Sequence, residues 1–439
     1  LVDRFARVLL SRTENYPARD IVVFQDTPAW PFERAIGDEA ARLMARVAAD
    51  DLPWTEVVTA DWTMIDGTLA ARYPTDHVGF GWSRAHYTDG RPAAGVLSTN
   101  GLYQRYRSTP SNKMRKPANQ VSRIFACADF LRLTVPFDAD VDLGDEDEVA
   151  DAIRNDPGCA TCHDVLDPIA GYLWGHAFDI GDTYAMLDAA TYHPERERRW
   201  RQETGLPPGW YGQPGESLED LGHQIAQDPR FVPCAVQQAV EQLLPEQLED
   251  EDALQVHADD FADDGLRYRA LLRSIVTDPT YGADRRWMDP DLLESQLEAL
   301  TGYVWTGSSD QPLLHAERHG LLTLAGGIDG ETVTAPADQP STTILLVQDR
   351  LATAAADHAV AHPEHLFDLD PRHRATRSNV RRQIVRLREA IHGVLDPDDP
   401  DVDELLEVHD QALAAAGDPA AAWTVVLAVM FRDPAFVTY

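Results

Sequence analysis

The spacing of apolar residues along the chain is mainly helical. Seven segments place apolar side chains three or four positions apart, a pattern that predicts amphipathic helices, and several begin with a residue suited to capping a helix N-terminus. The predicted helices span residues 38–51, 217–229, 266–279, 289–305, 342–361, 378–395 and 418–434. Strand-like segments such as residues 20–25 are few and isolated. We therefore expect a mostly α protein with few short strands.

Changes in composition indicate where the helical regions separate. Acidic or Gly/Pro-rich stretches occur near residues 135–150, 204–216, 246–265 and 396–404. The 439 residues are enough for two or three domains with their own cores. The predicted division is an N-terminal helical domain over residues 1–100, a middle module over 101–204 and a C-terminal helical region over 205–439.

An Asp-Pro pair followed one residue later by an aromatic residue occurs at the end of three helical segments. It is found at residues 228–231, 278–281 and 433–436. Proline cannot continue a helix, and it pushes the preceding residue out of the helical conformation. We interpret these pairs as helix ends.

The charge of the chain is strongly negative. The formal net charge is −35, so nucleic acid is excluded as an expected partner because its phosphates would be repelled. Lys113 and Lys116 are the only lysines, and such a surface suits a saline or extracellular setting, although a genome that favours Arg codons is an alternative explanation. No apolar run reaches the 18 residues that predict a membrane span. The chain begins LVDRFARVLLSR, and we expect that an export signal preceded it.

One short segment carries a recognisable chemical motif. In RNDPGCATCHDVLDPIAGYL (154–173), Cys159, Cys162 and His163 stand together. Structural zinc sites usually need a second ligand pair, and a thioredoxin-like thiol pair would accompany a βαβ pattern; the sequence has neither. Cys-x-x-Cys-His is the attachment pattern of c-type haem, in which both thiols bind the haem and the histidine binds the iron. We therefore predict one covalent haem c.

Haem attachment of this type indicates a compartment. It takes place after export, so we expect a periplasmic or extracellular protein. The remaining cysteines are Cys127 and Cys234. A leftover pair in an exported protein suggests a disulfide. Two buried free thiols that act as small apolar side chains are the alternative.

Residues around the motif are candidates for holding the haem. A turn at Pro168 would bring a backbone carbonyl to the second imidazole nitrogen of His163, unless this proline simply ends a helix. Segment 101–123 is basic and has no acidic residue, so it could contact the haem propionates or serve as a docking patch. The basic candidates are Arg105, Arg107, Lys113 and Arg115, with Lys116 and Arg123 in the same segment. The candidate pocket aromatics are Tyr172 and Trp174.

The sequence identifies the second axial ligand of the iron less clearly than the first. Met186 and His193 are the leading candidates, followed by His176, with Met114 upstream of the motif. Met186 could instead be a core residue, and His193 a loop residue. An open iron position is a further alternative, and it would favour reactions with small ligands over electron transfer.

Beyond the motif, the chain resembles a family of large secreted proteins of planctomycetes and myxobacteria that carry a c-type haem among domains of unknown function. The matching segments are residues 52–73, 90–127, 159–179, 228–244, 266–281, 285–305 and 422–439. The resemblance implies a secreted monohaem module within helical domains, with thioether bonds at Cys159 and Cys162 and His163 as proximal ligand. Cys127 and Cys234 match cysteines of the family, which also suits a disulfide. The family supplies no established activity.

The expected function is one-electron transfer by an exported monohaem c-type cytochrome. Its acidic surface would attract a basic redox partner, within a homo-oligomer or a larger complex. One alternative is a haem enzyme, for example peroxidase-like, with an open iron site. A second alternative is a structural subunit of a cell-surface complex or filament, because most of the chain lies outside any haem module of ordinary size.

Overall fold

The chain forms two compact units. The computed structural model describes residues 1–11, 29–106, 113–134, 141–142, 145–176, 192–244, 247–282, 287–307, 312–314, 321–328, 333, 336–337 and 339–438. Among these residues, unit 1 lies within 1–281 and unit 2 within 282–439. The boundaries predicted at 100/101 and 204/205 both fall inside unit 1, and the division near residue 282 was not predicted.

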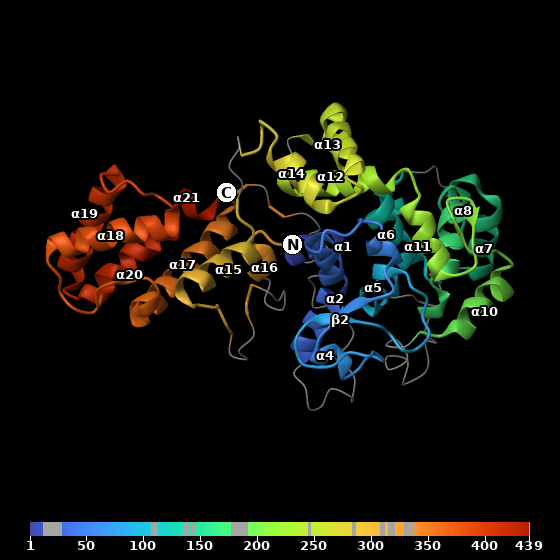
Figure 1. The fold of residues 1–439 in the computed structure, drawn as a ribbon, viewed down its shortest axis with the longest axis horizontal. Helices are drawn as coiled ribbons and strands as arrows, with labels where there is room; N and C mark the ends of the chain where they lie inside the picture. Colours follow the sequence, from blue (N-terminus) through green and yellow to red (C-terminus); the bar gives the residue numbers. More distant parts are fainter. Residues whose placement is uncertain are drawn as a thin grey trace. The chain divides into compact units, whose positions relative to one another are not determined.

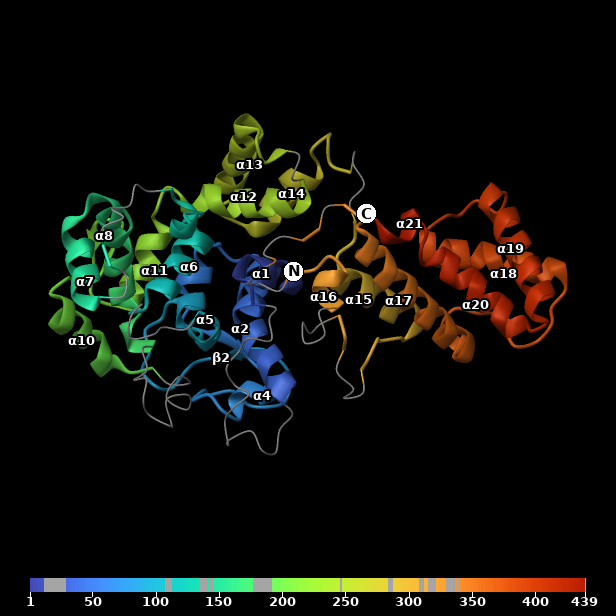
Figure 2. The ribbon, with the colours of Figure 1, turned by 180° about the vertical axis from the view of Figure 1, so that it is seen from behind.

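Unit 1 is built mainly from helices (Figures 1 and 2). Its α-helices are α1 (Val2–Leu9), α2 (Ala29–Ala49), α3 (Glu56–Thr59), α4 (Gly67–Ala70), α5 (Asn100–Arg105), α6 (Arg115–Ala126), α7 (Glu146–Asn155), α8 (Pro157–Tyr172), α10 (Pro194–Thr204), α11 (Leu218–Ala226), α12 (Phe231–Leu243), α13 (Glu251–Asp263) and α14 (Tyr268–Val276). Short 3-10 helices are η3 (Gly95–Ser98), η4 (Phe130–Arg132) and η5 (Trp174–His176). Both views show α7 and α8 side by side at the end of unit 1 that also holds α10.

Strands are short and few, which confirms the mostly α prediction. β1 (Thr63–Ile65) pairs antiparallel with β2 (Ser83–Ala85), with Met64 opposite Arg84. β3 (Gly209–Trp210) pairs antiparallel with β4 (Gln213–Pro214). The predicted strand at residues 20–25 lies outside the described residues. Within the described part of the chain, no helix is long and apolar enough to cross a membrane.

Aromatic packing joins the two ends of unit 1. Trp54 stacks on Tyr268 with ring centroids 4.5 Å apart, and Phe5 lies 5.3 Å from Trp54 and 5.2 Å from Tyr268. The Trp54 backbone N–H also donates to the carbonyl of Leu266 at 2.8 Å. These contacts hold α1 and α14 against the segment that follows α2.

Unit 2 is a helical domain with its own core. It contains α15 (Pro290–Thr301), α16 (Leu321–Leu324), α17 (Thr342–Ala361), η8 (Pro363–His365), α18 (Arg377–His392), α19 (Pro400–Ala416), α20 (Pro419–Met430) and α21 (Pro434–Val437). α20 packs against both α17 and α19. Trp423 on α20 is 1% exposed and packs edge-on against Phe367 at 5.3 Å. Since this core is separate from unit 1, unit 2 has the anatomy of an independent domain.

Capping residues explain several helix boundaries. The predicted segment 342–361 matches α17, which begins after Ser341, whose hydroxyl accepts from the Ile344 N–H. Gly302 takes a left-handed conformation (φ 73°) and ends α15 at Thr301, earlier than predicted. α2 begins nine residues before the predicted helix at 38–51, at Ala29. Helix existence was therefore predicted better than helix ends, as expected for pattern-based reasoning.

The close contact of α11 with α3 gives a stability prediction. Gly222 is buried on α11, and a Cβ there would overlap the Val58 carbonyl oxygen. Gly222→Ala is therefore expected to lower the free energy of unfolding by about 3 kcal/mol, because backbone atoms must move to relieve the overlap. Denaturant unfolding measures the change. The matched control is Gly81→Ala, whose Cβ would meet no atom within 4 Å; equal stability of the two variants would contradict the tight α3–α11 contact.

Candidate functional site

The Cys-x-x-Cys-His motif lies in the first two turns of α8. Asp156 caps the helix by accepting from the Cys159 N–H at 2.9 Å, and Pro157 occupies the first helical position. Residues three and four apart share a helix face, so Cys159, Cys162 and His163 point to the same side of α8. Both cysteines are free and partly buried.

A carboxylate holds the imidazole of His163. The Nδ1 atom of His163 lies 3.1 Å from Asp167 Oδ1, one turn further along α8. Arg115 on α6 donates to the same carboxylate, from Nε to Oδ1 at 2.6 Å and from Nη2 to Oδ2 at 2.9 Å. Asp167 is only 6% exposed. Burial raises the pKa of Asp167, but the hydrogen bonds from Arg115 and His163 outweigh it, and the net pKa is lowered.

The prediction for Pro168 was wrong in both of its forms. Pro168 neither forms a turn that offers a carbonyl to His163 nor ends the helix, because α8 continues to Tyr172. Proline removes one backbone donor inside a helix, which leaves the carbonyl of Asp164 without its usual partner. Asp164 is exposed, so water can satisfy that carbonyl. The partner of His163 is the neighbouring side chain of Asp167.

The two thiols differ from those of a reactive redox pair. Burial, followed by the nearby carboxylate of Asp156, raises the pKa of Cys159, and burial raises the pKa of Cys162. Redox-active cysteines at helix N-termini have a lowered thiol pKa, because the thiolate is the attacking form. The electrostatics of this helix end therefore disfavour thiol–disulfide chemistry.

Two of the basic candidates hold α1. Arg105 is 5% exposed and donates from Nε to the Leu10 carbonyl at 3.2 Å, and Arg123 donates from Nη2 to the Val8 carbonyl at 3.0 Å. Carbonyls at the C-terminal end of a helix lack intrahelical donors, so arginine is a natural partner for them. These contacts account for both arginines without a bound anion.

The other basic candidates are placed differently. Arg115 is engaged by Asp167, as described above. Lys113 and Lys116 are exposed next to the start of α6, and Arg107 lies outside the described residues. Propionate binding therefore stays a prediction, with Lys113 and Lys116 as the exposed cations among the described residues of this segment.

The aromatic candidates pack the far end of α8. Tyr172 lies nine residues beyond His163, about 13 Å along a helix, and its hydroxyl donates to Gln224 at 2.7 Å. Trp174 packs against Trp200 of α10 with ring centroids 5.2 Å apart. Both side chains secure α8 to its neighbours, and their contact with a haem stays a prediction.

The structure describes some of the candidate distal iron ligands. Met186 lies outside the described residues. His193 precedes α10, and its Nδ1 lies 3.2 Å from Glu195 Oε1. His176 is buried and stacks on Tyr103 with ring centroids 3.8 Å apart. Burial, with further contributions from nearby Arg91 and His193, lowers the pKa of His176 well below its usual value.

Cys127 and Cys234 form a disulfide. Their sulfur atoms are 2.13 Å apart, and the bond joins the end of α6 to α12 across a sequence separation of 107 residues. The pairing predicted from the sequence is confirmed. Because α6 also supplies Arg115, the disulfide anchors the helix that packs on the Cys-x-x-Cys-His segment.

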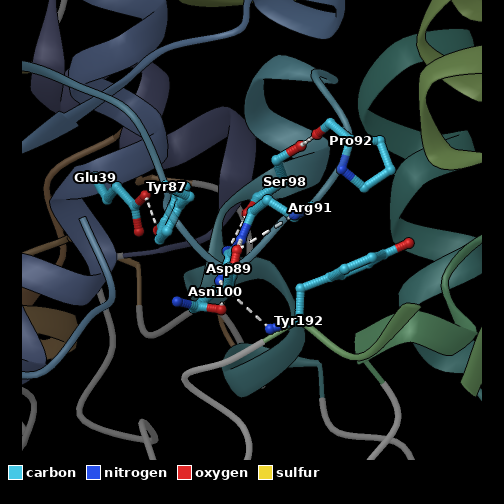
Figure 3. Close-up of polar contacts among 8 residues, drawn as sticks. All are labelled: Glu39, Tyr87, Asp89, Arg91, Pro92, Ser98, Asn100 and Tyr192. Atoms are coloured by element: carbon cyan, nitrogen blue, oxygen red, sulfur yellow. Dashed lines mark hydrogen bonds and ion pairs between the residues drawn. The ribbon is translucent and has the colours of Figure 1, made fainter. Parts of the chain in front are cut away.

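Sequence reasoning missed a buried polar network in unit 1 (Figure 3). The Arg91 side chain is 2% exposed and forms an ion pair with Asp89 at 2.6 Å. Arg91 also donates to the Ser98 carbonyl at 2.6 Å and to Asn100 Oδ1 at 3.2 Å. The Tyr192 N–H donates to Asp89 at 2.8 Å. In the sequence, Asp89 and Arg91 look like ordinary charged residues of a surface loop, so no sequence pattern predicted that they are buried.

Glu39 lies beside this network in an unusual setting. It is 0% exposed, and its Oε1 accepts from the hydroxyls of Thr63 (2.9 Å) and Tyr87. Its Oε2 has no hydrogen-bond partner among the described residues. Burial raises the pKa of Glu39 from 4.5 to about 7, against the lowering effect of the two hydroxyls and Arg91.

The raised pKa of Glu39 gives a pH-dependent prediction. The folded state keeps its proton up to about pH 7 whereas the unfolded state loses it near 4.5, so stability falls as pH rises through this window. Glu39→Gln keeps the accepting oxygen and removes the titration. Its free energy of unfolding relative to wild type should rise by on the order of 3 kcal/mol between pH 4.5 and 7. Denaturant unfolding at several pH values checks this, with the exposed Glu219→Gln as control; a pH-independent difference would contradict it.

Comparisons with known proteins add no assignment. No family model, curated protein or solved structure gives a significant match to this chain. Within the described residues, no group of three or more His, Cys, Asp or Glu side chains converges as a metal site. The Cys-x-x-Cys-His face of α8 supplies one imidazole and two thiols.

Proposed function

We propose that this chain is an exported monohaem c-type cytochrome that transfers single electrons. The observation that carries the proposal is the face of α8, where two free cysteines one turn apart stand beside a histidine whose Nδ1 is already held by Asp167. This leaves the Nε2 of His163 as the atom that can bind iron. The donor set therefore fits a covalent haem c.

Each residue of the site has a distinct task in this proposal. Cys159 and Cys162 would anchor the haem by thioether bonds, and His163 would be its proximal ligand. When bound, haem supplies a one-electron couple whose potential depends on its axial ligands and on burial. Asp167 and Arg115 would keep the imidazole in one orientation.

The disulfide and the charge support the cellular setting. Disulfides such as Cys127–Cys234 persist in oxidising compartments, which agrees with a periplasmic or extracellular location. The net charge of −35 would steer a basic redox partner toward the protein and would do so less strongly at high salt.

Two further functions are each favoured by one observation. The carboxylate partner of His163 would raise the basicity of an iron-bound imidazole, and electron donation by an axial ligand favours O–O cleavage, as a peroxidase-like enzyme requires.

Unit 2 has its own core and contains none of the thioether or proximal-ligand candidates, which favours a role in a larger assembly. Both alternatives keep the same haem site.

Mass spectrometry tests the proposal directly. The chain would be exported to a bacterial periplasm together with a c-type haem maturation system and denatured before measurement. The expected mass is that of the chain plus one haem. A mass of the chain alone, in protein with native helicity and an intact Cys127–Cys234 disulfide, would show that the motif has another use.

A further inference from the structure

The contacts of Asp167 point to a role beyond holding α6 and α8 together. We infer that Asp167, fixed by Arg115, is a positioning residue that makes His163 a strongly donating iron ligand and so lowers the midpoint potential of the haem. This inference rests on the proposed function, because it concerns the same histidine. The inference adds how one residue of the chain would set the midpoint potential of the haem, and with it the direction of electron transfer to or from a partner.

The geometry leaves His163 with one available ring nitrogen. At 3.1 Å, Nδ1 is the atom that faces Asp167 Oδ1. A carboxylate accepts hydrogen bonds, so Nδ1 carries the proton and the lone pair of Nε2 points away from Asp167. The His163 side chain is 23% exposed. The tautomer needed for iron binding is therefore set before any haem arrives.

Arg115 keeps Asp167 in place and charged. The guanidinium approaches both carboxylate oxygens from α6, in the two-pronged arrangement that matches the two groups. Arg115 comes from a helix anchored at its other end by the Cys127–Cys234 disulfide. Contacts with α6 and α8 therefore fix the Asp167 carboxylate, so it does not reorient when the imidazole of His163 moves.

A charged partner has a predictable effect on an iron ligand. Hydrogen bonding to a carboxylate raises the basicity of the ligating histidine. A more basic ligand stabilises ferric iron more than ferrous iron, so the ferric form is favoured and the midpoint potential falls. A backbone carbonyl at this position, as a turn at Pro168 would have supplied, carries no net charge and would have a smaller effect.

The experiment compares two isosteric substitutions on α8. Asp167→Asn removes the charge that touches His163. Asp164→Asn removes the same charge from the exposed residue next to His163, so it controls for the general electrostatic effect. Redox titration of the haem protein is expected to show a higher midpoint potential for Asp167→Asn, with the ferrous-to-ferric ratio at fixed potential raised about tenfold, which is about 59 mV for one electron. Asp164→Asn should shift it much less.

A second variant keeps the inference testable if the Asp167→Asn protein does not fold. Asp167→Asn leaves Arg115 without its carboxylate, and an unpaired buried charge is destabilising. Asp167→Asn combined with Arg115→Gln removes both charges and is expected to raise the potential in the same direction. Equal potentials for Asp167→Asn and Asp164→Asn, in folded proteins, would overturn the inference.

A measurement on the haem-free protein separates this inference from the proposed function. Nitrogen-15 NMR of His163 in wild type is expected to show a proton on Nδ1, and in the Asp167→Asn variant a larger share of the other tautomer. If wild type binds no haem, the proposed function fails, whereas the NMR result still decides whether Asp167 positions His163. An unchanged tautomer in the variant would overturn the positioning role.

Discussion

A protein in which Cys159 and Cys162 are both replaced by alanine is expected to fold normally and to carry no covalent haem. Both side chains are partly exposed on the first turns of α8 and make no disulfide, and alanine favours helix. Without thiols, no thioether bond can form. Haem staining after denaturing electrophoresis should therefore fall to background.

The control for this prediction lies in the same turn. Thr161 is exposed between the two cysteines, and its hydroxyl donates to the Pro157 carbonyl at 2.7 Å. Thr161→Ala should keep full haem staining. Haem that stays bound to the double cysteine variant under denaturing conditions would contradict the assignment of Cys159 and Cys162.

Removal of the disulfide is expected to cause the largest loss of stability. Cys127→Ser with Cys234→Ser opens a link across 107 residues, and a link of this span destabilises the unfolded chain by about 5 kcal/mol. Cys234 is also 2% exposed, so serine there adds a buried hydroxyl. Denaturant unfolding should show the loss in unit 1.

Reduction offers an independent check of the same prediction. A reductant should lower the stability of wild-type unit 1 toward that of the double serine variant and leave the variant unchanged. Unfolding of unit 2, whose described residues include no cysteine, serves as an internal control. A wild-type transition that does not respond to complete reduction would show that the disulfide contributes nothing to stability.

Local patterns predicted the elements that depend on local chemistry. The helical spacing at 342–361 gave α17 with its Ser341 cap, because both features are written in neighbouring residues. The pairing of Cys127 with Cys234 followed from counting cysteines once two were assigned to the motif. In both cases few arrangements compete for the same residues.

Asp-Pro pairs show where local reasoning was incomplete. α20 ends at Met430, just before Asp433-Pro434, which confirms the predicted helix end, but Asp433 also caps a new helix whose first residue is Pro434. The same arrangement begins α8 at Asp156-Pro157 and α20 at Asp418-Pro419. Proline lacks an N–H that the first helical position does not need, so the pair suits a helix start as well as an end.

Contacts between distant segments could not be predicted from the sequence. Arg115 and Asp167 are 52 residues apart and meet only because α6 packs against α8. Arg105 looked like a free cation in a basic segment, but the fold buries it against α1. Glu39 sits among helix-forming residues, and its burial depends on β1 and on Tyr87, which lies 48 positions away.

The absorption spectrum of the exported protein, oxidised and then reduced, with and without cyanide, distinguishes an electron carrier from the alternatives. Two protein ligands on the iron are expected to give the bands of a low-spin c-type haem that sharpen on reduction and do not respond to cyanide. A high-spin spectrum that shifts with cyanide would replace the electron carrier with the haem enzyme. A folded protein with no haem bands would contradict the assignment of Cys159, Cys162 and His163 as haem-binding residues.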